Sequence, residues 1–223
     1  MKRFLGIISA IFLIAGLFAQ EEPVEEAPSA AFDFVLQFEP ALYLNTESPL
    51  VSAPSPLIYP ISFGILWPNA SKIAVQPTLS FFMMNHLFYN GKAVPAEIEN
   101  RTSTTLSFML NVPLVFSILL SKSRFQLDLG PGVLMRFGLL SPGVREYDSG
   151  WTGSAAGDIE AINVWFWKDL RWLYLSAGAS WLYNLTPQLR AGPTINVYVP
   201  VGGLISDHNA QAMIISAGIK ICR

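Results

Sequence analysis

The chain has 223 residues, of which 52% are hydrophobic and only 13% charged, with a formal net charge of −2. This charge argues against nucleic acid as a partner, and the length suits one domain better than two. The single cysteine, Cys222, excludes an intramolecular disulfide and a cysteine-rich metal site. The two histidines, His86 and His208, leave little material for a metal or general-base centre.

Residues 1–19 have the pattern of a secretory signal peptide. Lys2 and Arg3 precede an apolar run at 4–18, and Ala19 supplies a small residue for cleavage. An uncleaved membrane anchor is the alternative, but the run is shorter than the roughly 18 residues of a spanning helix. Residues 20–31 are acidic and contain prolines. They cannot build a core, so we expect a short tether before one domain at 32–223.

From Phe32 onward, apolar residues alternate with polar or small ones in the period-two pattern of β-strands. The pattern recurs in eight segments, and the apolar phase of each carries no charged residue. The segments are Phe32–Leu44, Leu57–Trp67, Ile73–Met83, Thr104–Ile118, Phe125–Phe137, Leu173–Tyr183, Leu189–Val201 and Gln211–Ile221. The pattern therefore predicts an all-β chain.

The opposite phase carries small residues, amides and charged side chains. The charged ones are three acids and three bases: Asp33, Glu39, Asp128, Arg136, Arg190 and Lys220. In a soluble sandwich or a lipocalin-like barrel this face would meet water, whereas in an outer-membrane barrel it lines the lumen. Segment length and the small residues favour the second interpretation. We expect an eight-stranded antiparallel up-and-down transmembrane β-barrel, plugged by an ion-pair network of these six charges.

The connections alternate in length. Those at 68–72, 119–124 and 184–188 are short, whereas 84–103 and 138–172 are the longest. Membrane barrels have short periplasmic turns and long extracellular loops. We therefore expect the loops 84–103 and 138–172 at the cell surface, as the candidate contacts for a surface ligand, and both termini in the periplasm.

An apolar stretch at 159–167 alternates poorly. As a ninth strand it would place the termini on opposite sides of the membrane, so we expect a loop lid instead. The lid residues are Ile162, Val164, Trp165, Phe166 and Trp167. Ten strands would keep the same parity and are the alternative count.

Prolines recur on the apolar face of the four segments that run outward: Pro40, Pro77, Pro131 and Pro193. Proline cannot donate to a strand ladder. Each of these positions therefore predicts a bulge or a local kink in its strand.

Together these features resemble the small outer-membrane β-barrels of diderm bacteria, the OmpA/OmpX/OmpW-like group. The likeness rests on the signal peptide, the eight segments, the loop asymmetry and the turn Leu185-Thr186-Pro187-Gln188-Leu189. It implies a porin-like or cell-surface protein of the outer membrane, with membrane lipid and the barrel-assembly machinery as partners. The group often ends in an aromatic residue, and the ending Cys222-Arg223 departs from this.

Candidates for catalysis are few. Ser206-Asp207-His208 contains an adjacent acid and base, although these residue types also favour a hairpin turn, and His86 is predicted to lie in a loop. We expect no catalytic residue, metal site or cofactor, and a structural or surface-interaction role through the outer loops. The alternatives are a narrow channel or carrier for small apolar solutes, gated by 162–167, and a lipid-modifying outer-membrane enzyme that uses His208.

Overall fold

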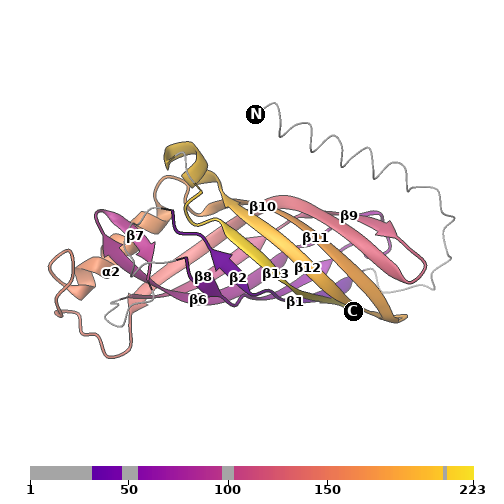
Figure 1. Ribbon diagram of the computed structural model, residues 1–223, viewed down its shortest axis with the longest axis horizontal. Helices are drawn as coiled ribbons and strands as arrows, with labels where there is room; N and C mark the ends of the chain where they lie inside the picture. Colours follow the sequence, from indigo (N-terminus) through magenta and orange to yellow (C-terminus); the bar gives the residue numbers. More distant parts are fainter. Residues whose placement is uncertain (1–31, 47–54, 97–102, 208–209) are drawn as a thin grey trace.

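The computed structural model describes residues 32–46, 55–96, 103–207 and 210–223, which form a single antiparallel β-barrel (Figure 1). The expected signal peptide and tether, residues 1–31, lie outside the described residues. In the part of the chain that is described, no helix is both long and apolar enough to cross a membrane.

The barrel has eight strands, and the first four are each interrupted once. These four consist of β1 (Asp33–Phe38) and β2 (Ala41–Tyr43), β3 (Leu57–Ile58) and β4 (Ile61–Leu66), β5 (Ile73–Val75) and β6 (Thr78–Tyr89), and β8 (Ser103–Asn111) and β9 (Leu114–Leu119). The last four are β10 (Ser123–Leu140), β11 (Leu173–Thr186), β12 (Leu189–Pro200) and β13 (Ile214–Cys222). A further short strand, β7 (Lys92–Pro95), pairs with β6.

The ring closes between its first and last strands. Each strand pairs antiparallel with the next, and β1 pairs with β13, so that Val35 lies opposite Cys222 and Phe38 opposite Ile219. The predicted eight-stranded antiparallel barrel is thereby confirmed. Ten strands is the wrong count, because residues 155–167 form a helix and not a strand.

Side chains alternate between the two sides of the wall, as the two-residue period of a strand requires. In β1, Val35 and Gln37 point inward and are buried, while Phe34 and Leu36 are exposed on the outside. Other exposed outward side chains include Phe63, Phe81, Leu129 and Ile195. The outer surface is therefore apolar, and most of the polar groups lie within.

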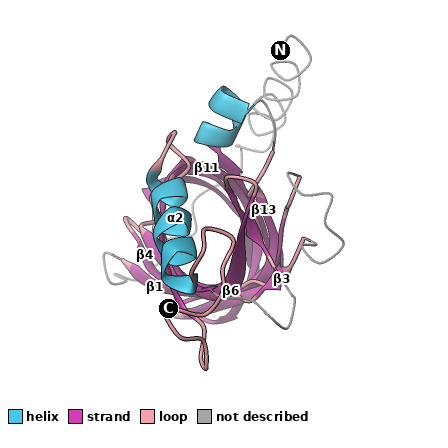
Figure 2. Cartoon of the chain, turned by 90° about the vertical axis from the view of Figure 1, so that its left-hand side faces the viewer, coloured by secondary structure: helices cyan, strands magenta, loops and turns pink. Residues whose placement is uncertain are grey.

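The two ends of the barrel differ. At one end, here called the turn end, the connections are 67–72, 120–122 and 187–188. At the other, the loop end, longer connections carry β7, the helix α2 (Ala155–Trp167) and a π-helical turn at Gly203–Asp207. Figure 1 shows α2 and β7 at the left. Figure 2 looks onto this loop end and shows α2 over one side of the strand ring.

Both of the long loops expected from the sequence are shorter than predicted. Strand β6 continues to Tyr89 and β8 begins at Ser103, so the connection between them is 90–102 and includes β7. Strand β10 continues to Leu140, and the connection that follows it contains α2. These strands are longer than the alternating segments from which they were predicted, because their backbone pairing continues. His86 of β6, for example, still pairs with Ser103 of β8.

Prolines mark the four interruptions: Pro40, Pro60, Pro77 and Pro113. The break expected at Pro40 and Pro77 is present, whereas Pro131 and Pro193 lie within the continuous strands β10 and β12. At both positions the pairing with one side still skips two residues, Gly130 and Pro131 toward β8 and β9, and Gly192 and Pro193 toward β11, as expected where a proline cannot donate to the ladder.

Glycines on neighbouring strands accommodate three of these interruptions. A Cβ atom added to Gly64 would lie 2.5 Å from the Pro77 carbonyl oxygen, and one added to Gly130 would lie 2.6 Å from the Val112 carbonyl oxygen. A Cβ added to Gly218 would lie 2.7 Å from the Glu39 Cα. The interrupted strand thus approaches its neighbour where no side chain separates them.

Candidate functional site

The interior of the barrel is the candidate functional site. All six charged residues that the alternation assigned to the lumen lie inside the barrel: Asp33, Glu39, Asp128, Arg136, Arg190 and Lys220. They do not form one network. The structure distributes them over three levels between the turn end and the loop end, each with different partners.

The level nearest the turn end is an ion-paired group. Arg190 Nη2 donates to Asp33 Oδ2 from β12 to β1, across the intervening strand β13. Asn69 Nδ2 donates to Asp33 Oδ1 at 2.8 Å, and Arg124 Nη1 donates to the Asn69 carbonyl oxygen at 2.6 Å. The connection 67–72 is thereby tied into the lumen, where it helps to fill the turn end.

In the middle level, here called the charged layer, an acid and a base are each hydrogen-bonded to an amide side chain. Asn196 Nδ2 donates to Glu39 Oε1, and Lys220 Nζ donates to Gln126 Oε1 at 2.9 Å. Lys220 also attracts the carboxylates of Glu39 and Asp128 electrostatically. Buried charges require such compensation. At this level amide side chains carry the hydrogen bonds, where direct ion pairs were predicted.

Beyond the charged layer, toward the loop end, the lumen becomes apolar. One cluster of buried side chains, here called the apolar layer, crosses the barrel: Ala41, Tyr43, Ile58, Phe82, Met84, Met109, Leu134, Tyr174, Ala212 and Ile214. An interior of this kind was not predicted, because the alternation identified the inward phase mainly by its small and polar members. The apolar layer separates the charges of the middle level from the loop end.

Arg136 lies between the apolar layer and α2, and its contacts correct the predicted ion pair. Its Nη1 donates to the Tyr43 hydroxyl at 3.0 Å, and its Nη2 donates to the Arg171 carbonyl oxygen at 2.9 Å. Its guanidinium carbon lies 4.3 Å from the ring centroid of Phe166 and 5.9 Å from that of Trp165. Neutral oxygens and aromatic faces therefore replace the expected carboxylate, an arrangement that suits a planar guanidinium.

The helix α2 begins where the local sequence supplies caps. Ser154 Oγ accepts a hydrogen bond from the Gly157 N–H at 3.1 Å, the pattern of an N-terminal cap. Asp158 in the first turn accepts bonds from the backbone N–H groups of Trp151 at 3.0 Å and Thr152 at 2.8 Å. These bonds fold the preceding loop onto the start of the helix, so that loop and helix form one unit.

The five predicted lid residues all lie on α2, but only part of the set faces inward. Ile162, Trp165 and Phe166 are buried, whereas Val164 and Trp167 are exposed. Asn163 fixes the helix to the wall, because its Oδ1 accepts from the Gly138 N–H at 2.8 Å and its Nδ2 donates to the Gly138 carbonyl oxygen at 3.1 Å. The segment thus covers one side of the loop end as a helix rather than as an irregular loop.

Two lumen residues were missed from the sequence. His86 was predicted to lie in a loop, which is wrong: it is a residue of β6 with 1% exposure. Its Nδ1 lies 2.8 Å from Thr105 Oγ1, and its ring centroid lies 4.9 Å from that of Phe166. Arg124 is also buried, and it was missed because the predicted segment began at Phe125 while β10 begins at Ser123. Extending the alternation by three residues past Met83 and by one residue before Phe125 would have found both.

The catalytic alternative falls mostly outside the described part of the chain. His208 is not described, and for Ser206 and Asp207 only the backbone turn is. Within the described residues, no group of three or more histidine, cysteine or carboxylate side chains could hold a metal ion.

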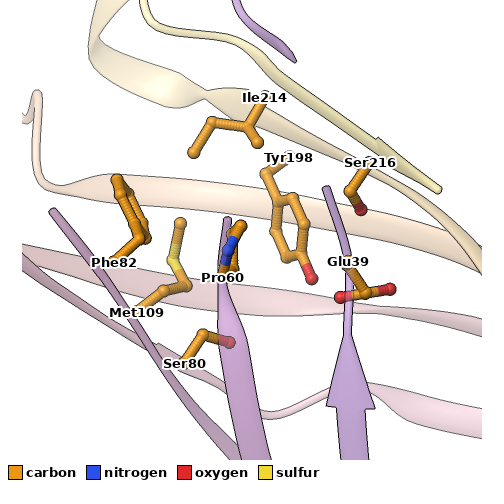
Figure 3. A pocket seen from close by; sticks show the side chains of 8 residues that line it. All are labelled: Glu39, Pro60, Ser80, Phe82, Met109, Tyr198, Ile214 and Ser216. Carbon is orange, nitrogen blue, oxygen red and sulfur yellow. The ribbon is translucent and has the colours of Figure 1, made fainter. Parts of the chain in front are cut away.

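Two of the cavities in the described part of the lumen are small. One of about 10 Å³ lies at the boundary between the charged and apolar layers (Figure 3). Its lining consists of Glu39, Pro60, Ser80, Phe82, Met109, Tyr198, Ile214 and Ser216. The other, also of about 10 Å³, lies beside Arg136 and Trp165. Each has room for about one water molecule, so neither is a pore.

Comparisons with known proteins found no matching family model and no matching curated sequence. Among solved structures, Neisserial surface protein A is 6% identical with a TM-score of 0.49, over 87% of this chain and 99% of that one. The attachment invasion locus protein Ail of Yersinia pestis is 8% identical with a TM-score of 0.44, over 86% and 95%. A major outer membrane protein of Thermus thermophilus is 10% identical with a TM-score of 0.43, over 87% and 100%. What the chain shares with these proteins is the barrel architecture, which its own strand pairing establishes.

Proposed function

We propose that this chain is an integral protein of the bacterial outer membrane, closed to water along its axis, which holds α2 and its loop at the cell surface. The observation that carries the proposal is the inverted distribution of side chains around a closed ring. Exposed Phe34, Phe63 and Ile195 lie on the outside, while Glu39 and Lys220 are fully enclosed. This distribution suits lipid outside and a filled lumen within.

The closed axis is supported at each level of the lumen. The Asp33–Arg190 ion pair and the bonded Asn69 fill the turn end, and the charged and apolar layers follow. An eight-stranded ring is only wide enough for side chains to fill. At the loop end, Trp165 and Phe166 of α2 pack against Arg136. An aqueous path would have to displace all of these groups.

The surface role is supported by what the loop end exposes. Tyr147 and Trp151 lie in the loop before α2 with 73% and 60% of their area exposed, and the Trp151 ring contacts that of Tyr89. The Asp158 bonds hold this loop in place, which lowers the entropy lost when a ligand binds. We assign no catalytic role, since His86 is enclosed by Phe166, Tyr43 and Thr105.

The test of membrane integration is fractionation. The protein should remain in the outer-membrane pellet after alkaline carbonate washing and dissolve only in detergent. On intact cells, protease should cut the loop 141–153 and leave the connection 187–188 uncut. Release of the protein by alkali alone contradicts integration, and cleavage at 187–188 on intact cells contradicts the orientation.

The test of the closed axis is conductance in planar bilayers. The refolded protein should show no steady current. The double variant Trp165→Ala/Phe166→Ala, which removes the inward rings of the lid, should at most add brief openings. Val164→Ala/Trp167→Ala, on the outward face of the same helix, is the matched control and should behave like the parent. A large steady current from the unaltered chain would show that the lumen is a channel, the alternative for small solutes.

A further inference from the structure

Arg136 of β10 is a buried cation that has no carboxylate partner among the described residues. Its side chain is 1% exposed. Its hydrogen bonds go to the Tyr43 hydroxyl and to the Arg171 carbonyl oxygen, which are both neutral acceptors. Its Nε atom is buried and has no acceptor within the described part of the chain. The positive charge of Arg136 is therefore met only by dipoles and by the rings of α2.

The other two bases predicted for the lumen are compensated by acids. Arg190 forms an ion pair with Asp33, and Lys220 attracts the carboxylates of Glu39 and Asp128. A buried charge without an opposite charge is costly, and an aromatic face attracts a cation less strongly than a carboxylate does. Arg136 therefore has an electrostatic requirement that the described residues meet only in part.

One of the small cavities lies beside this guanidinium, and its lining consists of Arg136, Trp165, Arg171, Pro200, Gly203, Gln211 and Ala212. This lining contains two guanidinium groups and one amide, and no carboxylate among the described side chains. The amide oxygen of Gln211 accepts from the Thr46 N–H at 2.6 Å, so the other polar atom of that side chain is a donor nitrogen. Side chains of these types mainly donate hydrogen bonds, which is the chemistry of an anion site.

The second guanidinium of the lining belongs to Arg171, which has a carboxylate partner. Its Nη1 lies 2.7 Å from Asp169 Oδ2. Its guanidinium carbon lies 4.5 Å from the ring centroid of Trp165, and that of Arg136 lies 5.9 Å from the same centroid. Two cations thus approach one ring at the edge of the cavity. The charge that lacks a carboxylate there is that of Arg136.

The size of the cavity restricts the kind of anion that it could hold. Its volume is about 10 Å³, which is room for about one water molecule. A single-atom anion needs only small adjustments of such a lining, whereas phosphate, sulfate or a carboxylate group would have to displace side chains. Arg171, Gly203 and Gln211 belong to connections at the loop end, so an ion would arrive from the aqueous phase at that end.

We propose that this cavity is a binding site for one chloride ion, the counter-ion of Arg136. The ion supplies the negative charge that the guanidinium lacks, and Arg136 Nε is the donor available to it. Arg136 also contacts the Phe166 ring of α2 and the connection after α2, so the ion strengthens the attachment of the helix to the barrel. The site lies inside the protein, and the proposal therefore does not depend on membrane integration.

The first test measures stability as a function of the anion. The full protein, refolded in zwitterionic phosphatidylcholine vesicles, is unfolded with urea in sodium chloride and in sodium isethionate of equal ionic strength. The urea midpoint should rise with chloride concentration and then level off, as for a ligand that binds only the folded state. Bromide should replace chloride, and sulfate should not. An equal effect of all these anions would indicate general screening and would overturn the site.

Substitutions at Arg136 test which residue holds the ion. Arg136→Met keeps most of the volume without the charge and should lose the chloride dependence, whatever its starting stability. Arg136→Lys keeps a cation and should retain the dependence at higher chloride concentrations. The matched control, Arg190→Gln, removes a lumen cation at the turn end and should respond to chloride as the parent does. A chloride dependence that persists unchanged in Arg136→Met overturns the assignment to Arg136.

The position of the ion is tested on the unaltered protein, so that this measurement does not depend on the folding of a variant. Crystals soaked in sodium bromide should show an anomalous peak between Arg136 and Arg171. A cavity that contains only water under these conditions overturns the proposal. A bromide peak combined with a urea midpoint that does not depend on chloride would indicate an adventitious ion only, and would overturn it as well.

Discussion

The charged layer and the apolar layer are enclosed by different parts of the wall. Around the charged layer, β1 is paired with both β4 and β13, and β4 with β6. Around the apolar layer, β3 is paired on one side only among the residues that the structure describes. Lys220 and Gln126 thus lie where the ladder is complete, and Phe82 and Met84 lie where it is interrupted. The two layers therefore differ both in the polarity of their side chains and in the pairing of the strand segments that surround them.

The largest expected effect concerns Arg136, which joins the apolar layer to α2. Arg136→Ala leaves the Tyr43 hydroxyl and the Arg171 carbonyl without this donor and opens a cavity under Phe166. We expect the free energy of unfolding to fall by about 3–5 kcal/mol, measured by urea unfolding in vesicles. Arg136→Met, which keeps most of the volume, should recover part of this loss. Equal losses in the two variants would show that packing contributes nothing there.

The next effect sharpens the contrast between the outer surface and the lumen. Ile195, in the middle of β12 and opposite Ala179 and Ala217, is exposed on the outer surface. Ile195→Arg places a charge in lipid and should cost about 2–4 kcal/mol. Thr186→Arg, at the turn end, is the control and should change stability little. If both arginines cost the same, the outer surface does not lie in the hydrocarbon region.

The fold was predictable because the outer surface has one simple requirement. The outward positions of a membrane barrel are apolar, so Phe34, Leu36 and Phe38 indicate which side of the first strand faces outward. The same pattern recurs in each of the other segments. The strand ends were less predictable. Strands β6 and β10 are longer than the predicted alternating segments, because both continue to pair with β8. The end of the pairing between β4 and β6 at Ile61 and Phe81 was not predictable, because it depends on which residue of another strand lies opposite Pro60.

A smaller effect concerns the interruptions at which a glycine on the neighbouring strand allows a close approach. Gly130→Ala would bring its Cβ to 2.6 Å from the Val112 carbonyl oxygen and 2.9 Å from the Pro113 nitrogen. Since backbone must shift, we expect a loss of about 1–3 kcal/mol. Gly138→Ala is the control, because its nearest neighbours are side-chain atoms of Ile162 and Asn163 at 3.3 and 3.4 Å. A Gly130→Ala barrel as stable as the parent would contradict the role of this glycine in the close approach.

The smallest effect concerns the turn end. Asp33→Asn keeps the shape of the side chain but removes the charge that faces Arg190. This end is partly open to solvent, so we expect a loss of about 1–2 kcal/mol. In a double-mutant cycle with Arg190→Gln, the coupling energy should shrink as salt is raised. A coupling energy that does not change with salt would place this pair in an environment as enclosed as the charged layer.

The candidate site was predicted in position but not in chemistry. The inward phase located all six charged residues, because alternation alone fixes which side of a strand a residue faces. Their partners depend on cross-lumen contacts between distant segments, such as Asn196 with Glu39 and Arg136 with Phe166. The helical spacing of Ile162, Trp165 and Phe166, preceded by Ser154, is a signal from which α2 could have been predicted.

The pairing of β1 with β13 has a consequence for how the molecule forms. The ladder that closes the ring joins Val35 to Cys222 and Phe38 to Ile219, so the two strands involved are separated by nearly the whole described chain. Such a non-local pairing closes slowly, and until it forms, the first and last strands both present unpaired edges that can bind to other chains. Successful biogenesis therefore requires that both edges be shielded from the moment the first strand emerges until the last one arrives.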